Sequence, residues 1–127
     1  MKVTRISSGS RFEVEAAYSR AVVCDGWIFV SGTTGMDYAT MTLAEGVVAQ
    51  TEQCLRNIES ALAQVGADLS HVVRVKYFLP DRYEFEACWP ALRAAFGAAP
   101  PAATMIEAGL VDPAMRIEIE VTARLPA

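Results

Sequence analysis

Two glutamates near the end of the chain are the residues best suited to acid–base chemistry. Glu118 and Glu120 are separated by one residue within an alternating apolar and polar segment, 116–125. Successive side chains of a strand point to opposite faces of a sheet, so the two carboxylates share one face, about 7 Å apart. This spacing leaves two interpretations open: a solvated charged face, or the acid–base wall of a cleft.

Other reactive side chains give weaker signals. His71 is the only histidine and follows Ser70 at the expected start of a strand, which is typical of a surface position. The chain has three cysteines, Cys24, Cys54 and Cys88, an odd number that is not spaced like metal ligands, so we expect reduced, mostly buried thiols. We therefore expect no metal site.

A run of small residues, Ser31-Gly32-Thr33-Thr34-Gly35, follows the second expected strand. It lacks the spacing of a nucleotide-binding loop, and it is either a plain turn or a loop that contacts a ligand. We include Ser31, Gly32 and Thr33 among the expected ligand contacts. The Tyr18 phenol is a polar group on an apolar body, which suits a cleft wall or an interface.

Periodicity and turn residues predict the elements that must position these side chains. Asp25-Gly26 is suited to a type I′ turn, and it predicts a hairpin of strands 18–24 and 27–31. A helical pattern over 43–65 ends at Gly66, a position suited to a left-handed cap. The remaining pattern predicts strand 72–79, a helix from 85 to 96 that contains Pro90, strand 103–110 and the final strand 116–125.

Length and composition limit the possible classes of protein. The 127 residues predict one domain spanning 1–127, and 53% apolar content in so small a chain favours a homo-oligomer. No apolar run is long enough to span a membrane, and the N-terminus lacks the apolar core of a secretion signal, so we expect a cytoplasmic protein. The net charge of −4 argues against nucleic acid as a partner.

An ordered set of segments resembles the RidA/YjgF family. The set consists of Tyr18, Phe29-Val30-Ser31-Gly32, Gln50 with Leu55-Arg56-Asn57-Ile58, the 72–81 strand, Pro101-Ala102 and Ile117-Glu118-Ile119-Glu120. The resemblance implies an α/β (α+β) chorismate-mutase-like fold, a mixed sheet with two helices packed on one face. It also implies a homotrimer that binds a small molecule in clefts between subunits, and cofactor-free hydrolysis of enamines and imines such as 2-aminoacrylate.

The resemblance also assigns roles to individual positions. Tyr18, Ser31, Gly32 and Glu118 match cleft positions of the family, and Glu118 takes the role of orienting or activating water. The family binds the substrate carboxylate with an arginine after the Pro-Ala pair, and here that position is Ala103. Two further cleft positions of the family, an asparagine and a cysteine, fall at Trp89 and Met105.

These departures lead us to expect a substrate other than 2-aminoacrylate. A non-catalytic trimer that binds or senses a small metabolite is the alternative. Arg20 and Arg116 are candidates for a displaced carboxylate-binding group, although the sequence favours a surface salt bridge for each of them.

Overall fold

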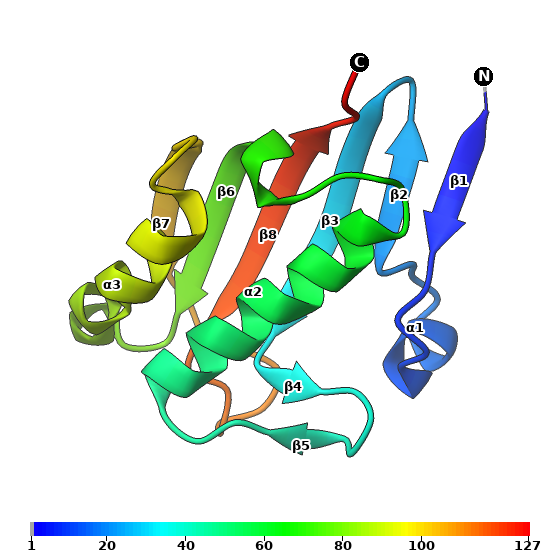
Figure 1. Cartoon of the computed structure of the whole chain (residues 1–127). Helices are drawn as coiled ribbons and strands as arrows, with labels where there is room; N and C mark the ends of the chain where they lie inside the picture. The colour runs from blue at the N-terminus through cyan, green and yellow to red at the C-terminus, as the bar shows by residue number, and fades with distance from the viewer. Residues whose placement is uncertain (1) are drawn as a thin grey trace.

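The alternating C-terminal segment forms the centre of the sheet in the computed structural model, which describes residues 2–127 (Figure 1). This strand, β8 (Glu118–Arg124), lies between β3 (Trp27–Thr34) and β6 (Val72–Leu79), and it is antiparallel to both. The full order is β1-β2-β3-β8-β6-β7, with β1 (Val3–Ile6), β2 (Ala21–Cys24) and β7 (Ala102–Glu107) completing the sheet. Only β6 and β7 pair in parallel, which confirms the predicted mixed sheet.

The predicted hairpin is confirmed at its turn and corrected at its start. Asp25 and Gly26 both have positive φ, 54° and 80°, as a type I′ turn requires. However, β2 begins at Ala21, so Tyr18 and Arg20 lie in the preceding loop and not on a strand. The chain cannot continue as a strand there, because Ala17 adopts a left-handed conformation with φ 59°.

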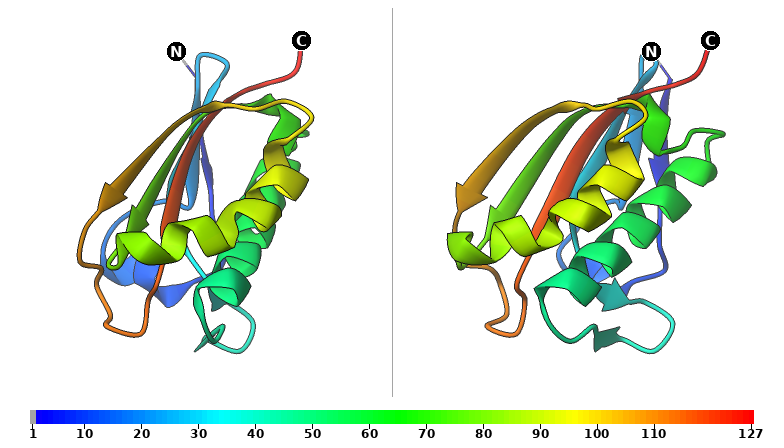
Figure 2. Two further views of the ribbon diagram at one scale, coloured as in Figure 1. Left: turned by 90° about the vertical axis from the view of Figure 1, so that its left-hand side faces the viewer. Right: turned by 60° about the vertical axis from the view of Figure 1, so that its left-hand side comes forward.

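Two long helices cover one face of the sheet (Figure 2). They are α2 (Val47–Ala63) and α3 (Phe85–Phe96), and Gly66 follows α2 with the expected positive φ of 74°. The first helix starts four residues later than predicted, after Gly46 with φ 85°. Pro90 lies in the second turn of α3 and does not interrupt it, and β7 ends at Glu107, earlier than predicted.

Neither of these two long helices covers the opposite face of the sheet. Trp27, Phe29 and Ile106 on this face are 39%, 48% and 41% exposed, whereas the β8 residues that face the helices, Ile119, Val121 and Ala123, are at most 1% exposed. No helix within residues 2–127 is long and apolar enough to cross a membrane. The short elements that periodicity did not reveal are β1, α1 (Arg11–Glu15), β4 (Met36–Asp37), β5 (Thr42–Leu43) and the 3-10 turns Leu69–His71 and Arg82–Glu84.

Candidate functional site

A β-bulge in β3 shapes the centre of the candidate site. Ser31 and Gly32 together oppose the single residue Glu120 of β8, between two regularly paired core positions, Val30 and Thr33. The hydroxyl of Ser31 donates to the Ser19 carbonyl at 2.7 Å, which fixes the loop before β2 against β3. The bulge therefore brings that loop and the small residues of β3 to one place.

Gly32 provides the space that the Glu118 carboxylate occupies. A Cβ placed on Gly32 would lie 1.9 Å from Oε2 of Glu118, far closer than any real contact. Thr34, two residues after Gly32, pairs directly with Glu118, so Gly32 and Glu118 are diagonal neighbours on the two strands. The carboxylate thus lies over the backbone of the bulge, and any side chain at position 32 would displace it.

These residues line a cavity of about 470 Å³, which we call the Glu118 cavity. Its polar wall comes from Tyr18, Arg20, Ser31, Tyr38 and Glu118 together with the Gly32 backbone. Its apolar wall includes Phe12, Met36, Val111 and Met115, which come from α1, from β4 and from the loop before β8. The volume lies in the range typical of small-molecule sites.

The Glu118 carboxyl has a perturbed acidity. Burial raises its pKa above the usual value for glutamate, the positive charge of Arg20 opposes this effect, and the negative charge of Glu120 adds to it. Glu120 itself faces Lys76, with 4.0 Å between the charged atoms. The two glutamates share a face as predicted, yet only Glu118 lines the Glu118 cavity. A carboxyl with a raised pKa is a stronger base than an ordinary glutamate and is suited to accept a proton during a reaction.

Arg20 is a buried cation in the same wall. It is 2% exposed, and its guanidinium donates to the Tyr38 hydroxyl and to the Gly32 carbonyl, each at 2.6 Å. Its Nε has no hydrogen-bond partner among residues 2–127. The Tyr18 ring lies 5.6 Å from the guanidinium carbon. Burial raises the pKa of the Tyr38 hydroxyl, and Arg20 lowers it in part.

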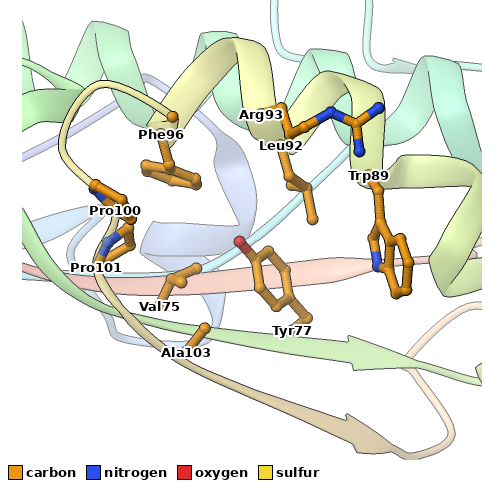
Figure 3. A pocket seen from close by; sticks show the side chains of 10 residues that line it. Val75, Tyr77, Trp89, Leu92, Arg93, Phe96, Pro100, Pro101 and Ala103 are labelled. Carbon is orange, nitrogen blue, oxygen red and sulfur yellow. The ribbon is translucent and has the colours of Figure 1, made fainter.

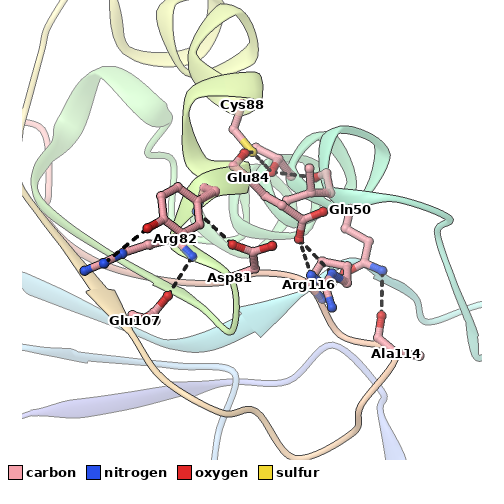
Figure 4. A network of polar contacts seen from close by, with 11 residues as sticks. Gln50, Asp81, Arg82, Glu84, Cys88, Glu107, Ala114 and Arg116 are labelled. Carbon is pink, nitrogen blue, oxygen red and sulfur yellow. Dashed lines mark hydrogen bonds and ion pairs between the residues drawn. The ribbon is translucent and has the colours of Figure 1, made fainter.

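Arg116 is instead held in a separate network of polar contacts (Figure 4). Its guanidinium donates two hydrogen bonds to Glu84, one of them from Nε at 2.8 Å, so the salt-bridge interpretation holds for this residue. The buried Gln50 accepts from the Arg116 amide at 2.7 Å and donates to the Ala44 and Ala114 carbonyls, each at 2.9 Å. Gln50 thereby fixes the loop that carries Val111 and Met115.

Trp89 and Ala103 line a different cavity, of about 380 Å³, which we call the Ala103 cavity (Figure 3). Parallel pairing of Ala103 with Val75 and of Met105 with Tyr77 places these side chains on the helix-covered face. Met105 is partly buried and packs against the core. The remaining lining residues are Val75, Tyr77, Leu92, Arg93, Phe96, Gly97, Pro100 and Pro101.

The predicted site residues thus form two groups within one chain. Tyr18, Ser31, Gly32 and Glu118 meet in the Glu118 cavity, whereas Trp89 and Ala103 meet elsewhere. Thr33 belongs to neither cavity, because the bulge turns it into the core, where it is fully buried and its hydroxyl donates to the Ser31 carbonyl. Sequence reasoning missed Arg93, since nothing in its surroundings along the chain distinguishes it from a surface arginine.

The histidine and cysteines have structural positions. Nδ1 of His71 accepts a hydrogen bond from the Asp68 amide at the start of the 3-10 turn before β6. Cys54 and Cys88 are fully buried, and burial raises the pKa of both thiols. Over residues 2–127, no three His, Cys, Asp or Glu side chains group closely enough to hold a metal ion.

Comparison with known proteins reveals clear similarities. The family model described as Endoribonuclease L-PSP matches residues 8–125. Protein DfrA of Myxococcus xanthus is 37% identical over 109 residues, which cover 84% of this chain and 83% of that protein. The 2-iminobutanoate/2-iminopropanoate deaminase of Capra hircus is 35% identical over 107 residues, covering 84% and 78%.

Solved structures give the same result. A member of the YjgF/YER057c/UK114 family from Mycobacterium tuberculosis superposes with a TM-score of 0.89 at 37% identity, covering 98% of this chain and 100% of that chain. RidA from a Psychrobacter species superposes with a TM-score of 0.80 at 30% identity, covering 85% and 88%. The fold is therefore shared over nearly the whole chain.

Proposed function

Because the chain belongs to the endoribonuclease L-PSP family, with relatives among the RidA and YjgF proteins, we propose that it is a cofactor-free hydrolase of a small imine or enamine. The observation that carries the proposal is the partly buried Glu118 carboxyl, with its raised pKa, in a cavity of substrate size. The deaminase name of a relative at 35% identity points to the same chemistry.

The mechanism uses Glu118 as the group that moves protons. Glu118 takes a proton from water while the water oxygen bonds to the imine carbon and the C=N π electrons move to nitrogen. The proton then passes from Glu118 to that nitrogen. Glu118 then takes the hydroxyl proton of the tetrahedral intermediate and passes it to the amine nitrogen, so that the C–N bond breaks, ammonia leaves and a carbonyl group remains. An enamine first gains a proton on carbon and loses one from nitrogen, which converts it into the imine.

We further propose that the working protein is a homotrimer whose clefts combine the two cavities of neighbouring subunits. The separation of Glu118 from Trp89 and Ala103 within one chain supports this arrangement, because a second copy supplies the missing group. The uncovered sheet face, with Trp27, Phe29 and Ile106 exposed, offers apolar surface for the contact. Light scattering coupled to gel filtration tests it, and a monomeric protein that turns over substrate would contradict it.

The substrate we propose is not 2-aminoacrylate. Position 103 carries a methyl group where the family binds a carboxylate, and Trp89 adds an apolar surface beside it. The same observation favours the second candidate, a trimer that binds a metabolite without reacting, because the Ala103 cavity can enclose an apolar group but has few polar side chains.

A single assay separates the two candidates. An amino-acid oxidase generates 2-imino acids of different size, semicarbazide traps them, and the protein is added in small catalytic amounts. We expect suppression of the trapped product by wild type, loss of suppression in Glu118→Ala, and retention in Glu120→Gln, which removes a charge two residues away on the same face. No suppression, beside a working deaminase, would contradict the hydrolase proposal, and saturable ligand-induced stabilisation would then support binding alone.

A further inference from the structure

Arg20 is a buried positive charge for which the described part of the chain, residues 2–127, provides no ion pair. Its hydrogen-bond partners are a hydroxyl and a carbonyl, those of Tyr38 and Gly32, and it forms no salt bridge within 4.0 Å to a carboxylate of residues 2–127. A buried charge is costly unless an opposite charge compensates it, and leaving one without a partner strongly destabilises a fold. The Glu118 carboxyl in the same wall interacts with the Arg20 charge but forms no ion pair with it, and a counterion supplied by a ligand removes the remaining cost.

Other arginines of the chain are engaged differently. Arg116 is paired with Glu84, and Arg124 lies over the Trp27 ring at 4.6 Å. Arg93 lines the Ala103 cavity but is exposed to solvent, where an unpaired charge is well hydrated. Among the residues that line the Glu118 cavity, Arg20 is the single cation.

The rest of the Glu118 cavity suggests what accompanies the negative charge. Phe12, Met36, Val111 and Met115 give it an apolar wall, and its volume of about 470 Å³ exceeds what a three-carbon acid fills. A ligand that matches both walls therefore joins an anionic group to a larger apolar group. A planar carboxylate is the anion that a guanidinium binds with best geometry.

We infer that Arg20, in place of the arginine absent at position 103, binds the carboxylate of the ligand, and that the Glu118 cavity selects acids with a bulky apolar side chain. The inference rests on the proposed function for the identity of the site. Arg20 is then a specificity-determining residue, and the substrate class becomes 2-imino acids larger than 2-aminoacrylate.

A matched pair of unreactive probes tests this inference. 4-Phenylbutanoate and 4-phenylbutanamide differ in charge but hardly in shape, and calorimetry measures the Kd of each. We expect wild type to prefer the acid by about 10- to 100-fold, the range for a charge-assisted hydrogen-bonded pair. Arg20→Met should remove the preference while amide binding stays nearly unchanged. Arg56→Met, which removes the same charge from an exposed position of α2, should keep it.

Several outcomes overturn the inference. Equal affinity of wild type for acid and amide would overturn it without any variant. Loss of the preference for the acid in Arg93→Met but not in Arg20→Met would also overturn it. If Arg20→Met does not fold, Arg20→Lys keeps a charge but loses the forked geometry, and a preference as strong as that of wild type would count against guanidinium binding. Because no probe reacts, acid selectivity without turnover would sustain this inference while contradicting the proposed hydrolysis.

Discussion

The Glu118 cavity and the Ala103 cavity are similar in size but differ in chemistry. The first combines a carboxyl of raised pKa, a buried guanidinium and two phenols on one polar wall. The second is formed by aromatic rings, prolines and small apolar side chains, and burial raises the pKa of its Tyr77 hydroxyl to about 12, so that this group stays neutral. The groups that can move protons are therefore confined to one cavity, while the other contributes shape.

Removal of the Glu118 carboxylate should have the largest effect on this contrast. In Glu118→Gln we expect turnover of 2-imino acids to fall by about 10²- to 10⁴-fold, because the amide cannot accept a proton from water. Initial rates in the trapping assay measure the loss. If Trp89→Leu, in the Ala103 cavity, reduced the chemical rate as strongly as Glu118→Gln, proton transfer would not be confined to the Glu118 cavity.

Gly32→Ala should have the next largest effect. The new methyl group would occupy the position of Glu118 Oε2 and displace the carboxylate, which we expect to reduce turnover by about 10- to 100-fold. Rates and circular dichroism are compared with Gly109→Ala, where an added Cβ meets no atom within 4 Å. A fully active, folded Gly32→Ala protein would show that the position of Glu118 over the bulge is not needed.

A guanidinium added to the Ala103 cavity should reduce the chemical difference between the two cavities. We expect Ala103→Arg to improve kcat/KM for small 2-imino acids by about tenfold, because a charge-assisted hydrogen bond then holds their carboxylate. Ala103→Leu serves as the control, since it adds bulk without charge. No gain in Ala103→Arg would argue against a cleft in which both cavities face one substrate.

Gln50→Leu should destabilise the loop that lines the Glu118 cavity and affect the Ala103 cavity less. The substitution leaves the Ala44 and Ala114 carbonyls and the Arg116 amide without their buried partner, and we expect it to cost about 1 to 3 kcal/mol in the free energy of unfolding. Urea denaturation measures this cost. A smaller decrease in turnover should accompany it, because the loop with Val111 and Met115 loosens.

The smallest expected effect concerns pH. Burial disfavours the charged form of Glu118, so its pKa is higher in the folded than in the unfolded state, and the stability it contributes is lost as pH rises through the folded pKa. Glu118→Gln should therefore melt slightly above wild type at neutral pH and equally at acid pH. Wild-type activity should fall as pH drops through the same pKa, and melting curves and rates over a pH series test both trends.

Much of the fold could be predicted because local signals determine it. The Asp25-Gly26 turn requires two positive φ angles, and few other residue pairs adopt them without strain. The β-branched and aromatic run 72–79 became β6 with the predicted bounds, since polar or turn residues flank it on both sides. The alternation of 116–125 likewise placed Glu118 and Glu120 on one face of β8.

The composition of each cavity depends on contacts that local patterns do not contain. One extra residue in β3 reverses which side chains face the core, so Thr33 turned inward although its neighbours line the Glu118 cavity. Ala103 joined Trp89 because of the parallel register of β6 and β7, which pairs residues 28 positions apart in the chain, such as Val75 and Ala103. Tyr38 reached the site through the short strands β4 and β5, which periodicity does not reveal.

The bulge at Ser31 and Gly32 also makes this protein a convenient scaffold for redesign. Regular pairing resumes on both sides of the bulge, and this pairing holds Val30 and Thr33 in the core. With Gly32 retained for the Glu118 carboxylate, sequence changes at Ser31 and in the loop of Tyr18 can therefore alter ligand preference without repacking the interior. A library restricted to these few positions would explore new specificities while the folding information carried by β3 and β8 stays intact.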